Sequence, residues 1–338
     1  MHMADALVSP AVAGTMYVAS AIAAGISIKK IHLEENPKKI PLMGVMGAFV
    51  FATQMINFTI PGTGSSGHLC GGMLLSALLG PYAGFLTMIG VLLIQCLMFA
   101  DGGILALGCN VWNMAFYGCF VGSLIIWRFI MKKGASRIKI FAASIAGCML
   151  TLQMGAFSVV VETMCSGVTE LPFKTFAMAM QPIHLAIGLV EGLITGCVLM
   201  FIYEARPELL WGIGRSDSSK NNGKLTFKVT MAVLAVSTVV IAGGLSLAAS
   251  SYPDGLEWSI EKLTGSTELE AEGGVYEDTA NIQKVTAIFP DYQLKNSDTP
   301  AGTSISGIAG GLIVVALCLA GCYILKFVKH QKREHEQY

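Results

Sequence analysis

The chain has 338 residues, of which 54% are hydrophobic and 13% are Asp, Glu, Lys or Arg, about half the charged fraction of an average soluble domain. Its mean hydropathy is +0.63 and it contains 38 glycines, a composition typical of membrane proteins with several helices packed closely through small residues. The 22 basic and 22 acidic residues cancel, which excludes a generally basic nucleic-acid-binding surface and the acidic composition of a disordered chain. Nine cysteines, most of them within apolar runs and none in a CxxC pair, are interpreted as small packing residues.

Apolar stretches of about 20 residues predict the membrane-spanning helices. In chain order they cover residues 11–28, 41–58, 68–80, 82–99, 104–131, 139–163, 180–203, 228–250 and 303–326. The third is short and ends at Gly80-Pro81, so we expect a half-helix, or a tilted helix, that lines a cavity. The predicted fold class is therefore all-α, a polytopic membrane protein with about nine transmembrane helices.

The basic residues predict the orientation, because positive charge stays on the cytoplasmic side. Of the 22 basic residues, 18 lie between spans 1 and 2, around the loop between spans 5 and 6, between spans 7 and 8, or after span 9. The segment 251–300 carries ten acidic residues and three lysines and is expected outside. This arrangement predicts an external N-terminus, on the same face as the loop 57–68. The first ten residues contain no Lys or Arg, so we expect no signal peptide and take Met1 as the mature start.

One internal boundary is predicted, at residues 204–227. This segment is polar and rich in turn-forming residues, as expected of a solvated cytoplasmic linker. It separates a seven-span domain, residues 1–203, from a two-helix domain, residues 228–338, with the external loop 251–300 between its two helices.

Histidine at position 2 suggests a metal site. The free α-amine of Met1, the deprotonated amide nitrogen of His2 and its imidazole Nδ1 would form adjacent chelate rings around one ion. A fourth nitrogen would complete a square, which favours Ni(II) or Cu(II) over tetrahedral Zn(II). His68 is the candidate, since it lies on the same predicted face, at the start of a helix, after a Gly- and Ser-rich loop that can bend sharply. Alternatively, His2 is a disordered terminal residue and His68 a polar residue that starts a helix. The spacing leaves both interpretations open.

Other polar residues have less specific signals. Met3 and His184 are candidates for groups that support the ligands or bind the ion transiently; the alternative is a core methionine and a histidine bonded to a backbone carbonyl. Asp101 is interpreted as a cap of the fifth span. Several polar residues within spans would either line a path or hold helices together: Gln54, Gln95, Asn110, Asn113, Gln153, Glu162 and Glu191. The sequence has no G-x-x-x-x-G-K-[ST] phosphate loop, no H-E-x-x-H and no G-x-S-x-G, so any ATP hydrolysis is expected in another chain.

Longer stretches of sequence resemble a known family. MHMADALVSP at the start, MGVMGAFVFATQMINF (43–58), PGTGSSGHLCGG (61–72) and the segment 78–118 with FADGG are similar to the CbiM/NikM-type substrate-capture subunit of energy-coupling-factor cobalt/nickel transporters. The hexapeptide PDGLEW (253–258) matches the PDGLE signature of a small accessory subunit, fused here behind the linker. We therefore name residues 1–203 the capture domain and residues 228–338 the accessory domain.

The resemblance implies a site, a cargo and partners. It assigns the metal to Met1 (amine), His2 (amide nitrogen and imidazole) and His68 (imidazole). Met3, His184 and Ser66 are candidates for supporting residues from their positions in the sequence, not from the resemblance. The cargo would be Ni(II) or Co(II), with no permanent cofactor and no nucleic acid. The expected partners are membrane lipid, a transmembrane coupling subunit and two cytoplasmic ATPase subunits, in the plasma membrane, and the accessory domain is expected to help load or open the site.

Two other functional classes stay open at this point. The chain would be a self-sufficient ion channel or secondary transporter if Glu162 and Glu191 provide the coupling. It would be an intramembrane metalloenzyme if the metal kept an open position next to a general base, although a square of four nitrogens offers neither conveniently.

Overall fold

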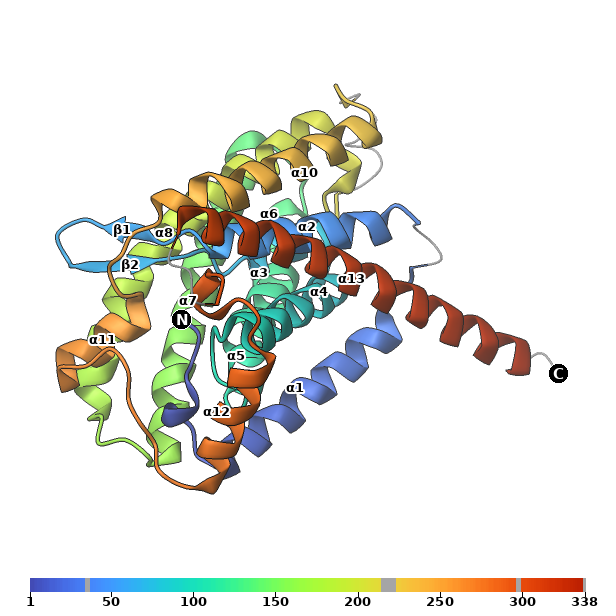
Figure 1. The fold of residues 1–338 in the computed structure, drawn as a ribbon. Coiled ribbons are helices and arrows are strands. Elements are labelled where there is room, and N and C mark those ends of the chain that lie inside the picture. Colours follow the sequence, from blue (N-terminus) through green and yellow to red (C-terminus); the bar gives the residue numbers. More distant parts are fainter. Residues whose placement is uncertain (34–36, 214–222, 296–298, 337–338) are drawn as a thin grey trace.

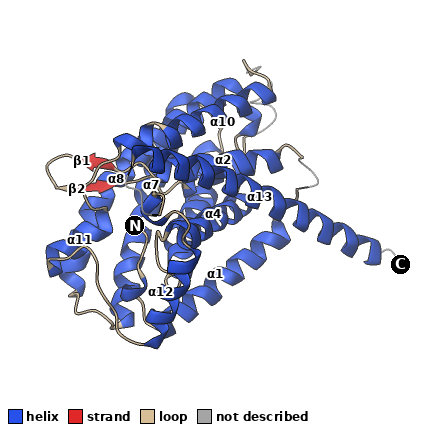
Figure 2. Cartoon of the chain, in the orientation of Figure 1, coloured by secondary structure: helices blue, strands red, loops and turns tan. Residues whose placement is uncertain are grey.

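The computed structural model describes residues 1–33, 37–213, 223–295 and 299–336, and it is mostly helical (Figures 1 and 2). Six helical stretches are long and apolar enough to cross a membrane: Pro10–Lys30, Pro81–Phe99, Leu107–Met131, Arg137–Ser166, Phe173–Ala205 and Pro300–Lys329. Two shorter apolar helices are α2 (Lys39–Gln54) and α10 (Phe227–Gly243). The predicted helical, multi-span membrane protein is confirmed. Each of the nine predicted spans contains a helix within the described residues, but six rather than nine reach spanning length.

The long stretches are made of the following elements. They are α1 (Pro10–Lys30), α4 (Pro81–Ile94) with a π-helical end at Gln95–Phe99, α5 (Leu107–Asn110) with the π-helical segment Val111–Trp127 and α6 (Arg128–Met131), α7 (Arg137–Ser166), α8 (Phe173–Ala205) and α13 (Pro300–Glu336). Ser9 caps α1 and Ser136 caps α7 through their side chains, as is usual for serine before a helix.

The expected half-helix is present as α3 (Gly72–Leu79), and all eight of its residues are buried. Glycines allow this burial. A Cβ on Gly72 would lie 3.0 Å from the Cα of Gly118, so only glycine lets α3 approach the π-helical segment so closely. Gly71 has a φ of 82°, a conformation that favours glycine. The sequence predicted His68 at the start of this helix. In the structure α3 starts at Gly72, so His68 lies four residues before it.

The Gly- and Ser-rich loop is an ordered β-hairpin. Strands β1 (Phe58–Ile60) and β2 (Ser65–Gly67) pair antiparallel, with Thr59 opposite Ser66. Gly62 and Gly64 occupy the turn with φ values of 78° and 75°, so these glycines serve a fixed turn. The expectation of an all-α chain with a freely bending loop is wrong at this point, and His68 follows directly from β2.

The accessory domain packs on two parts of the capture domain. Its apolar helices α10 and α13 lie beside α2, whereas its loop forms α11 (Gly255–Thr264) and α12 (Gly274–Thr286) on either side of the N-terminus (Figure 1). The chain start thus lies between segments that follow it by more than 250 positions. Of the predicted linker, residues 214–222 lie outside the described residues.

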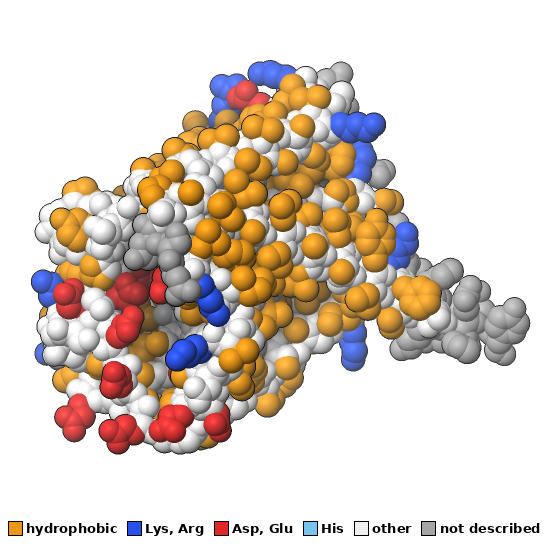
Figure 3. Space-filling model, in the orientation of Figure 1, with side chains coloured by type: hydrophobic (Ala, Val, Ile, Leu, Met, Phe, Trp, Pro, Cys, Tyr) orange, Lys and Arg blue, Asp and Glu red, His pale blue; other side chains and the backbone are white. Residues whose placement is uncertain are grey.

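Charges separate along the helices. In the view of Figure 3, acidic side chains gather at the end where α11 and α12 lie, basic side chains gather toward the other end, and hydrophobic side chains cover the surface between them. An apolar belt between two polar ends fits a bilayer.

Candidate metal centre

The N-terminal residues are fixed inside the helical bundle. Met1 is 4% exposed and Met3 is fully buried. The backbone of Met3 is held on both sides: its N–H donates to Asn110 Oδ1 (2.7 Å), and its carbonyl accepts from Asn110 Nδ2 (3.1 Å) and from the Gly103 N–H (2.9 Å). The Asn110 side chain thus pairs with both the N–H and the carbonyl of Met3, as a neighbouring β-strand would pair with a backbone. These bonds place the terminal amine instead of leaving it disordered.

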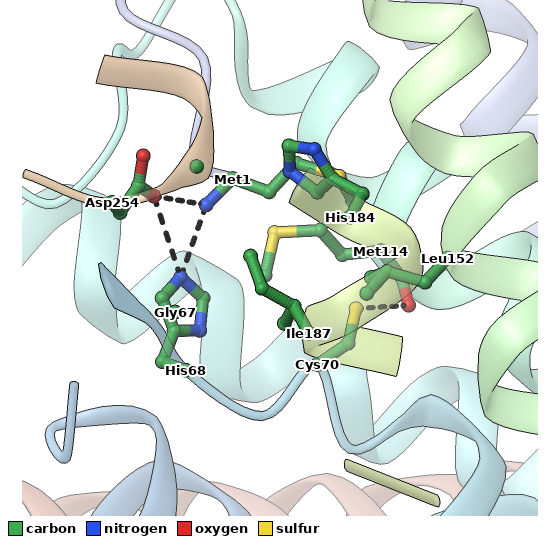
Figure 4. A pocket seen from close by; sticks show the side chains of 10 residues that line it. Met1, Gly67, His68, Cys70, Met114, Leu152, His184, Ile187 and Asp254 are labelled. Carbon is green, nitrogen blue, oxygen red and sulfur yellow. Dashed lines mark hydrogen bonds and ion pairs between the residues drawn. The ribbon is translucent and has the colours of Figure 1, made fainter. Parts of the chain in front are cut away.

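The Met1 amine and His68 meet in the bundle, as the sequence predicted (Figure 4). The amine nitrogen lies 3.0 Å from His68 Nε2. His68 Nδ1 lies 2.9 Å from the carbonyl of Leu69, and since a carbonyl only accepts, Nδ1 carries the proton. His68 Nε2 then presents its lone pair to the amine, as a metal-binding imidazole must.

A third group was missed by the sequence reasoning. The carboxylate of Asp254, from the accessory domain, forms an ion pair with the Met1 amine and lies 3.7 Å from His68 Nε2. It also starts α11: Asp254 Oδ1 accepts from the N–H groups of Leu256 (2.8 Å) and Glu257 (2.9 Å). The side chain of Glu257 returns to the Asp254 N–H, which completes a capping box. The D-x-x-E pattern predicts this cap, but no sequence pattern shows that the second oxygen binds the chain start.

The residues beside Asp254 dock onto the capture domain, and we call residues 252–258 the PDGLE segment. The carbonyl of Pro253 accepts from the Ser66 N–H (2.8 Å), and the Ser66 hydroxyl donates to the carbonyl of Tyr252 (2.7 Å). A Cβ on Gly255 would lie 3.0 Å from the ring of His184, so this position has little room for a side chain. Ser66, expected to support the ligands, instead binds the PDGLE segment.

His2 lies next to this cluster but does not face the amine. Its ring stacks on that of His68, with the centroids 5.2 Å apart. Its Nδ1 lies 3.0 Å from Asp101 Oδ1, and its Nε2 lies 3.3 Å from Gln95 Oε1. Tyr292 of the accessory domain joins the two partners, since its hydroxyl donates to Asp101 and accepts from Gln95 Nε2 (3.0 Å). Four side chains thus form a closed ring of contacts that fixes the imidazole.

The interpretation of Asp101 as a helix cap is wrong. Helix α5 begins at Leu107, and its N-cap residue, Ala106, has no side-chain cap. Asp5 instead accepts from the Ala106 N–H (3.0 Å). Asp101 is taken by His2 and Tyr292, two partners that are far from it in the sequence and that local spacing does not reveal.

Burial and the ion pair set the protonation of the cluster. Burial lowers the pKa of the Met1 amine, but the attraction and hydrogen bond of Asp254 outweigh it, and the pKa is raised above its ordinary value of 8.0. Burial by itself would raise the pKa of the Asp254 carboxyl. The Met1 amine and His68 outweigh this effect and hold the pKa of that carboxyl well below its usual range. Burial lowers the pKa of His2 to about 4. At neutral pH the metal-free cluster therefore holds an ammonium–carboxylate pair and a neutral His2.

A cavity of about 10 Å³ lies in this cluster, about the space that one water molecule needs. Met1, His68, Cys70, Met114, His184 and Asp254 are among its lining residues (Figure 4). His184 is thus close to the predicted ligands. Met3 does not line this cavity, and its sulfur accepts from Asn113 Nδ2 (3.5 Å).

The other polar residues of the spans form bonds between helices or along the backbone. Asn113 donates to Glu162 (2.6 Å), Glu191 accepts from the Gly71 N–H (2.8 Å), Gln54 donates to the Cys70 carbonyl (2.9 Å) and Gln153 to the Gln181 carbonyl (2.8 Å). Within the described residues, no three His, Cys, Asp or Glu side chains are close enough to hold a metal ion. A metal bound in this cluster would need the nitrogen atoms of the chain start.

The fold is similar to that of solved transition metal transporters. Two crystal structures described as a truncated transition metal transporter and a transition metal transporter are similar, with TM-scores of 0.53 and 0.52 and sequence identities of 31% and 32%. Both comparisons cover 60% of this chain, and 99% and 92% of the two solved chains.

The chain belongs to the CbiM family, described as the cobalt uptake substrate-specific transmembrane region, whose model matches residues 2–209; residues 228–327 match the PDGLE domain. A putative fused nickel transport protein NikMN of Archaeoglobus fulgidus is 38% identical over 95% of this chain and 97% of its own. A probable fused nickel transport protein LarMN of Lactiplantibacillus plantarum is 27% identical over 94% and 96%. A cobalt transport protein CbiM of Sorangium cellulosum is 29% identical over 56% of this chain and 84% of its own. The resemblance to a CbiM-type subunit fused to a PDGLE unit is confirmed.

Proposed function

We propose that this chain is the substrate-specific subunit of an energy-coupling-factor transporter and captures Ni(II) or Co(II) at the outer face of the plasma membrane. The observation that carries the proposal is the buried Met1 amine, 3.0 Å from His68 Nε2, with His2 stacked on His68. The names of the relatives, nickel transport and cobalt transport proteins, support these two ions as cargo. The ion is transported, so it is a substrate and not a resident cofactor.

The charge distribution supports an outward-facing site. The Met1 amine lies at the end of the bundle that carries α11, α12 and the acidic side chains, and the basic side chains gather toward the opposite end (Figure 3). Because positive charge is retained in the cytoplasm, the proposed site opens to the outside. The nine membrane spans and external N-terminus are part of this proposal.

Capture requires the ligand atoms to change partners. The amine nitrogen is paired with Asp254, and His2 Nδ1 is turned to Asp101. We propose that the ion replaces the proton of the amine, that Asp254 withdraws, and that the His2 ring turns so that Nδ1 joins the amide nitrogen. Ligands must be deprotonated to bind, so capture releases protons. The other ring nitrogen of His2 would then keep a hydrogen bond that orients it, as metal-bound histidines usually do.

The accessory domain is proposed to gate the site. It reaches the proposed ligands directly through Asp254, which binds the Met1 amine, and indirectly through Tyr292, which donates to Asp101, the partner of His2. Withdrawal of the PDGLE segment would free the amine, and a shift of Tyr292 would free His2. One domain thus controls both steps of the proposed capture.

Energy is proposed to come from partner chains, namely a transmembrane coupling subunit and two cytoplasmic ATPases. The sequence contains no phosphate loop of its own. The alternative, a self-sufficient channel or secondary transporter, depends on Glu162 and Glu191, whose described bonds to Asn113 and Gly71 tie the bundle together. Metal uptake into vesicles by the purified chain without ATPases would favour that alternative.

The proposed ligands are tested by metal titration of the purified full chain. Insertion of one alanine between Met1 and His2, His2→Ala and His68→Ala should each abolish high-affinity Ni(II) and Co(II) binding, because each removes a nitrogen or its position. His32→Ala is the matched control, since His32 lies beyond the far end of α1 and should bind metal like the wild type. High-affinity binding by all three ligand variants would refute the site.

A further inference from the structure

The ring of contacts around His2 contains two groups that only accept hydrogen bonds. The Tyr292 hydroxyl has a single proton, which it donates to the Asp101 carboxylate. It therefore accepts from Gln95 Nε2, at 3.0 Å, and this contact turns Gln95 Oε1 toward His2. Gln95 Oε1 lies 3.3 Å from His2 Nε2, and Asp101 Oδ1 lies 3.0 Å from His2 Nδ1. Each nitrogen of the His2 ring thus faces an acceptor.

A neutral imidazole has one N–H group, so it satisfies only one of these two acceptors. Asp101 is the nearer acceptor, and a carboxylate attracts the proton more strongly than an amide carbonyl does. In the metal-free protein the proton therefore lies on His2 Nδ1, and Nε2 faces the Gln95 carbonyl without one. Two buried acceptors held against each other are unfavourable, so the position of Gln95 calls for an explanation.

The backbone fixes both acceptors beside the ring. Gln95 is fully buried and begins the π-helical end of α4, and Ala100 ends that segment in the left-handed conformation, with a φ of 57°. The Asp101 N–H donates to the backbone carbonyl of Gln95 (3.1 Å). Short π-helical segments and left-handed residues other than glycine are both typical of functional sites. This local geometry brings Gln95 and Asp101 to different nitrogens of His2.

We propose that Gln95 is a positioning residue of the loaded site, and that its side-chain carbonyl accepts the Nε2 proton of His2 while Nδ1 binds the ion. This inference rests on the proposed function of the site. Binding through Nδ1 uses the lone pair of that nitrogen, so the ring proton must lie on Nε2. Gln95 then gives that proton a fixed acceptor, as the groups behind metal-bound histidines do. The Nδ1 proton leaves as the ion binds and Nε2 takes one from solvent, so this step releases no net proton.

The accessory domain determines which end of the Gln95 amide faces His2. The Tyr292 hydroxyl has no second proton to donate, so only the amide nitrogen of Gln95 can pair with it. The Tyr292 ring packs against Phe99, with the centroids 4.9 Å apart, which holds the hydroxyl in place. Without this contact the amide would be free to turn its NH₂ group to Nε2, which favours the tautomer that cannot bind the ion. The accessory domain thus supports the loaded site as well as covering it.

NMR of the full chain with ¹⁵N-labelled histidine tests the two tautomers. Square-planar Ni(II) is diamagnetic, so the ring ligands can be observed in the loaded protein. The His2 proton is expected on Nδ1 without metal. With Ni(II) it is expected on Nε2, visible and shifted downfield by its hydrogen bond. In Gln95→Leu, which removes the acceptor, this signal should be lost to exchange with water.

Metal titration gives the second measurement. Gln95→Leu should bind Ni(II) at least about tenfold more weakly, the smallest effect typical of groups that orient a metal ligand. Gln95→Glu has an acceptor at both ends of its carboxylate and should restore most of the affinity. Gln153→Leu is the matched control, since Gln153 donates to the carbonyl of Gln181 and not to a residue of the site, and it should bind like the wild type.

The outcomes separate this proposal from the proposed function. Wild-type affinity in Gln95→Leu, or an equal loss in Gln95→Leu and Gln95→Glu, would overturn the role of Gln95. If Gln95→Leu does not fold, the Ni(II)-loaded wild type decides, because an Nε2 proton of His2 that exchanges rapidly contradicts the bond. If His2→Ala and His68→Ala keep high-affinity binding, the site itself is wrong, whereas loss of binding in those two variants with unchanged binding by Gln95→Leu refutes only the role of Gln95.

Discussion

The carboxylate of Asp254 caps α11 and forms an ion pair with the Met1 amine, and the substitution Asp254→Asn separates these two roles. Asparagine is nearly the same size and is as good a helix N-cap as aspartate, so α11 should keep its start. The change removes the negative charge from the Met1 amine. If Asp254 holds the place of the ion, as we propose, the variant should bind Ni(II) more tightly than the wild type at neutral pH.

The magnitude follows from the protonation of the amine. In the wild type its pKa lies above 8.0, so at neutral pH a bound proton weakens metal binding by a factor of about ten or more. Without Asp254, its attraction and its hydrogen bond are lost, so the pKa of the amine falls, and only the more weakly acting Asp101 and Glu257 still oppose the effect of burial. The gain in apparent affinity is about fivefold or more if that pKa falls to neutrality, and it approaches about tenfold or more if the pKa falls below neutrality. The difference should vanish in alkaline buffer, above the raised pKa, where both proteins carry a neutral amine.

Isothermal titration calorimetry in buffers of different ionisation enthalpy measures both the affinity and the protons released. The wild type should release more protons at neutral pH than Asp254→Asn. Glu257→Gln is the comparison variant: it alters the other half of the capping box, its side chain forms no described bond to the Met1 amine, and its charge raises the pKa of that amine less than Asp254 does, so its effect on metal binding should be smaller. Weaker metal binding by Asp254→Asn at neutral pH would refute the reasoning, because the carboxylate would then act as a ligand of the ion.

Two further substitutions test the contacts of the accessory domain. Gly255→Ala would place a Cβ 3.0 Å from the His184 ring, so the PDGLE segment should dock poorly and limited proteolysis of the loop 251–300 should become faster; unchanged cleavage would contradict the close packing. Tyr292→Phe removes the hydroxyl that holds Asp101 and should let the His2 ring turn, so metal should load faster in stopped-flow measurements. An unchanged loading rate would show that Tyr292 does not restrain His2.

The sequence was sufficient for a helix in each of the nine predicted spans and for the two groups that meet, the Met1 amine and His68, but not for α11 and α12 in the loop 251–300. Apolar runs of about 20 residues placed a helix in each predicted span, because a bilayer demands such runs. Charge placed Met1 and His68 on one face. The geometry then agreed, with 3.0 Å between the amine and His68 Nε2.

The partners of these groups were not predictable. Asp254 has a local pattern that predicts a helix cap, and this pattern accounts for one of its carboxylate oxygens only. Asp101 also stands before a helix, but it binds His2 and Tyr292, which lie far from it in the chain. Such contacts depend on how segments distant in the chain pack, both within the capture domain and between the two domains, and this packing leaves no periodic pattern in one sequence.

The covalent joining of the two domains has a consequence for stoichiometry. Asp254 is part of the same chain as the amine that it binds, so each capture domain would carry one of the gates proposed above, and dilution could not remove it. A tethered partner meets its site at an effective concentration on the order of millimolar, whereas a separate subunit would need that concentration in the membrane or a tight interface. The contacts at Met1, Ser66 and His184 can therefore each be weak. Weak contacts would let the accessory domain release the site for each ion, and the covalent connection to the capture domain would bring it back afterwards.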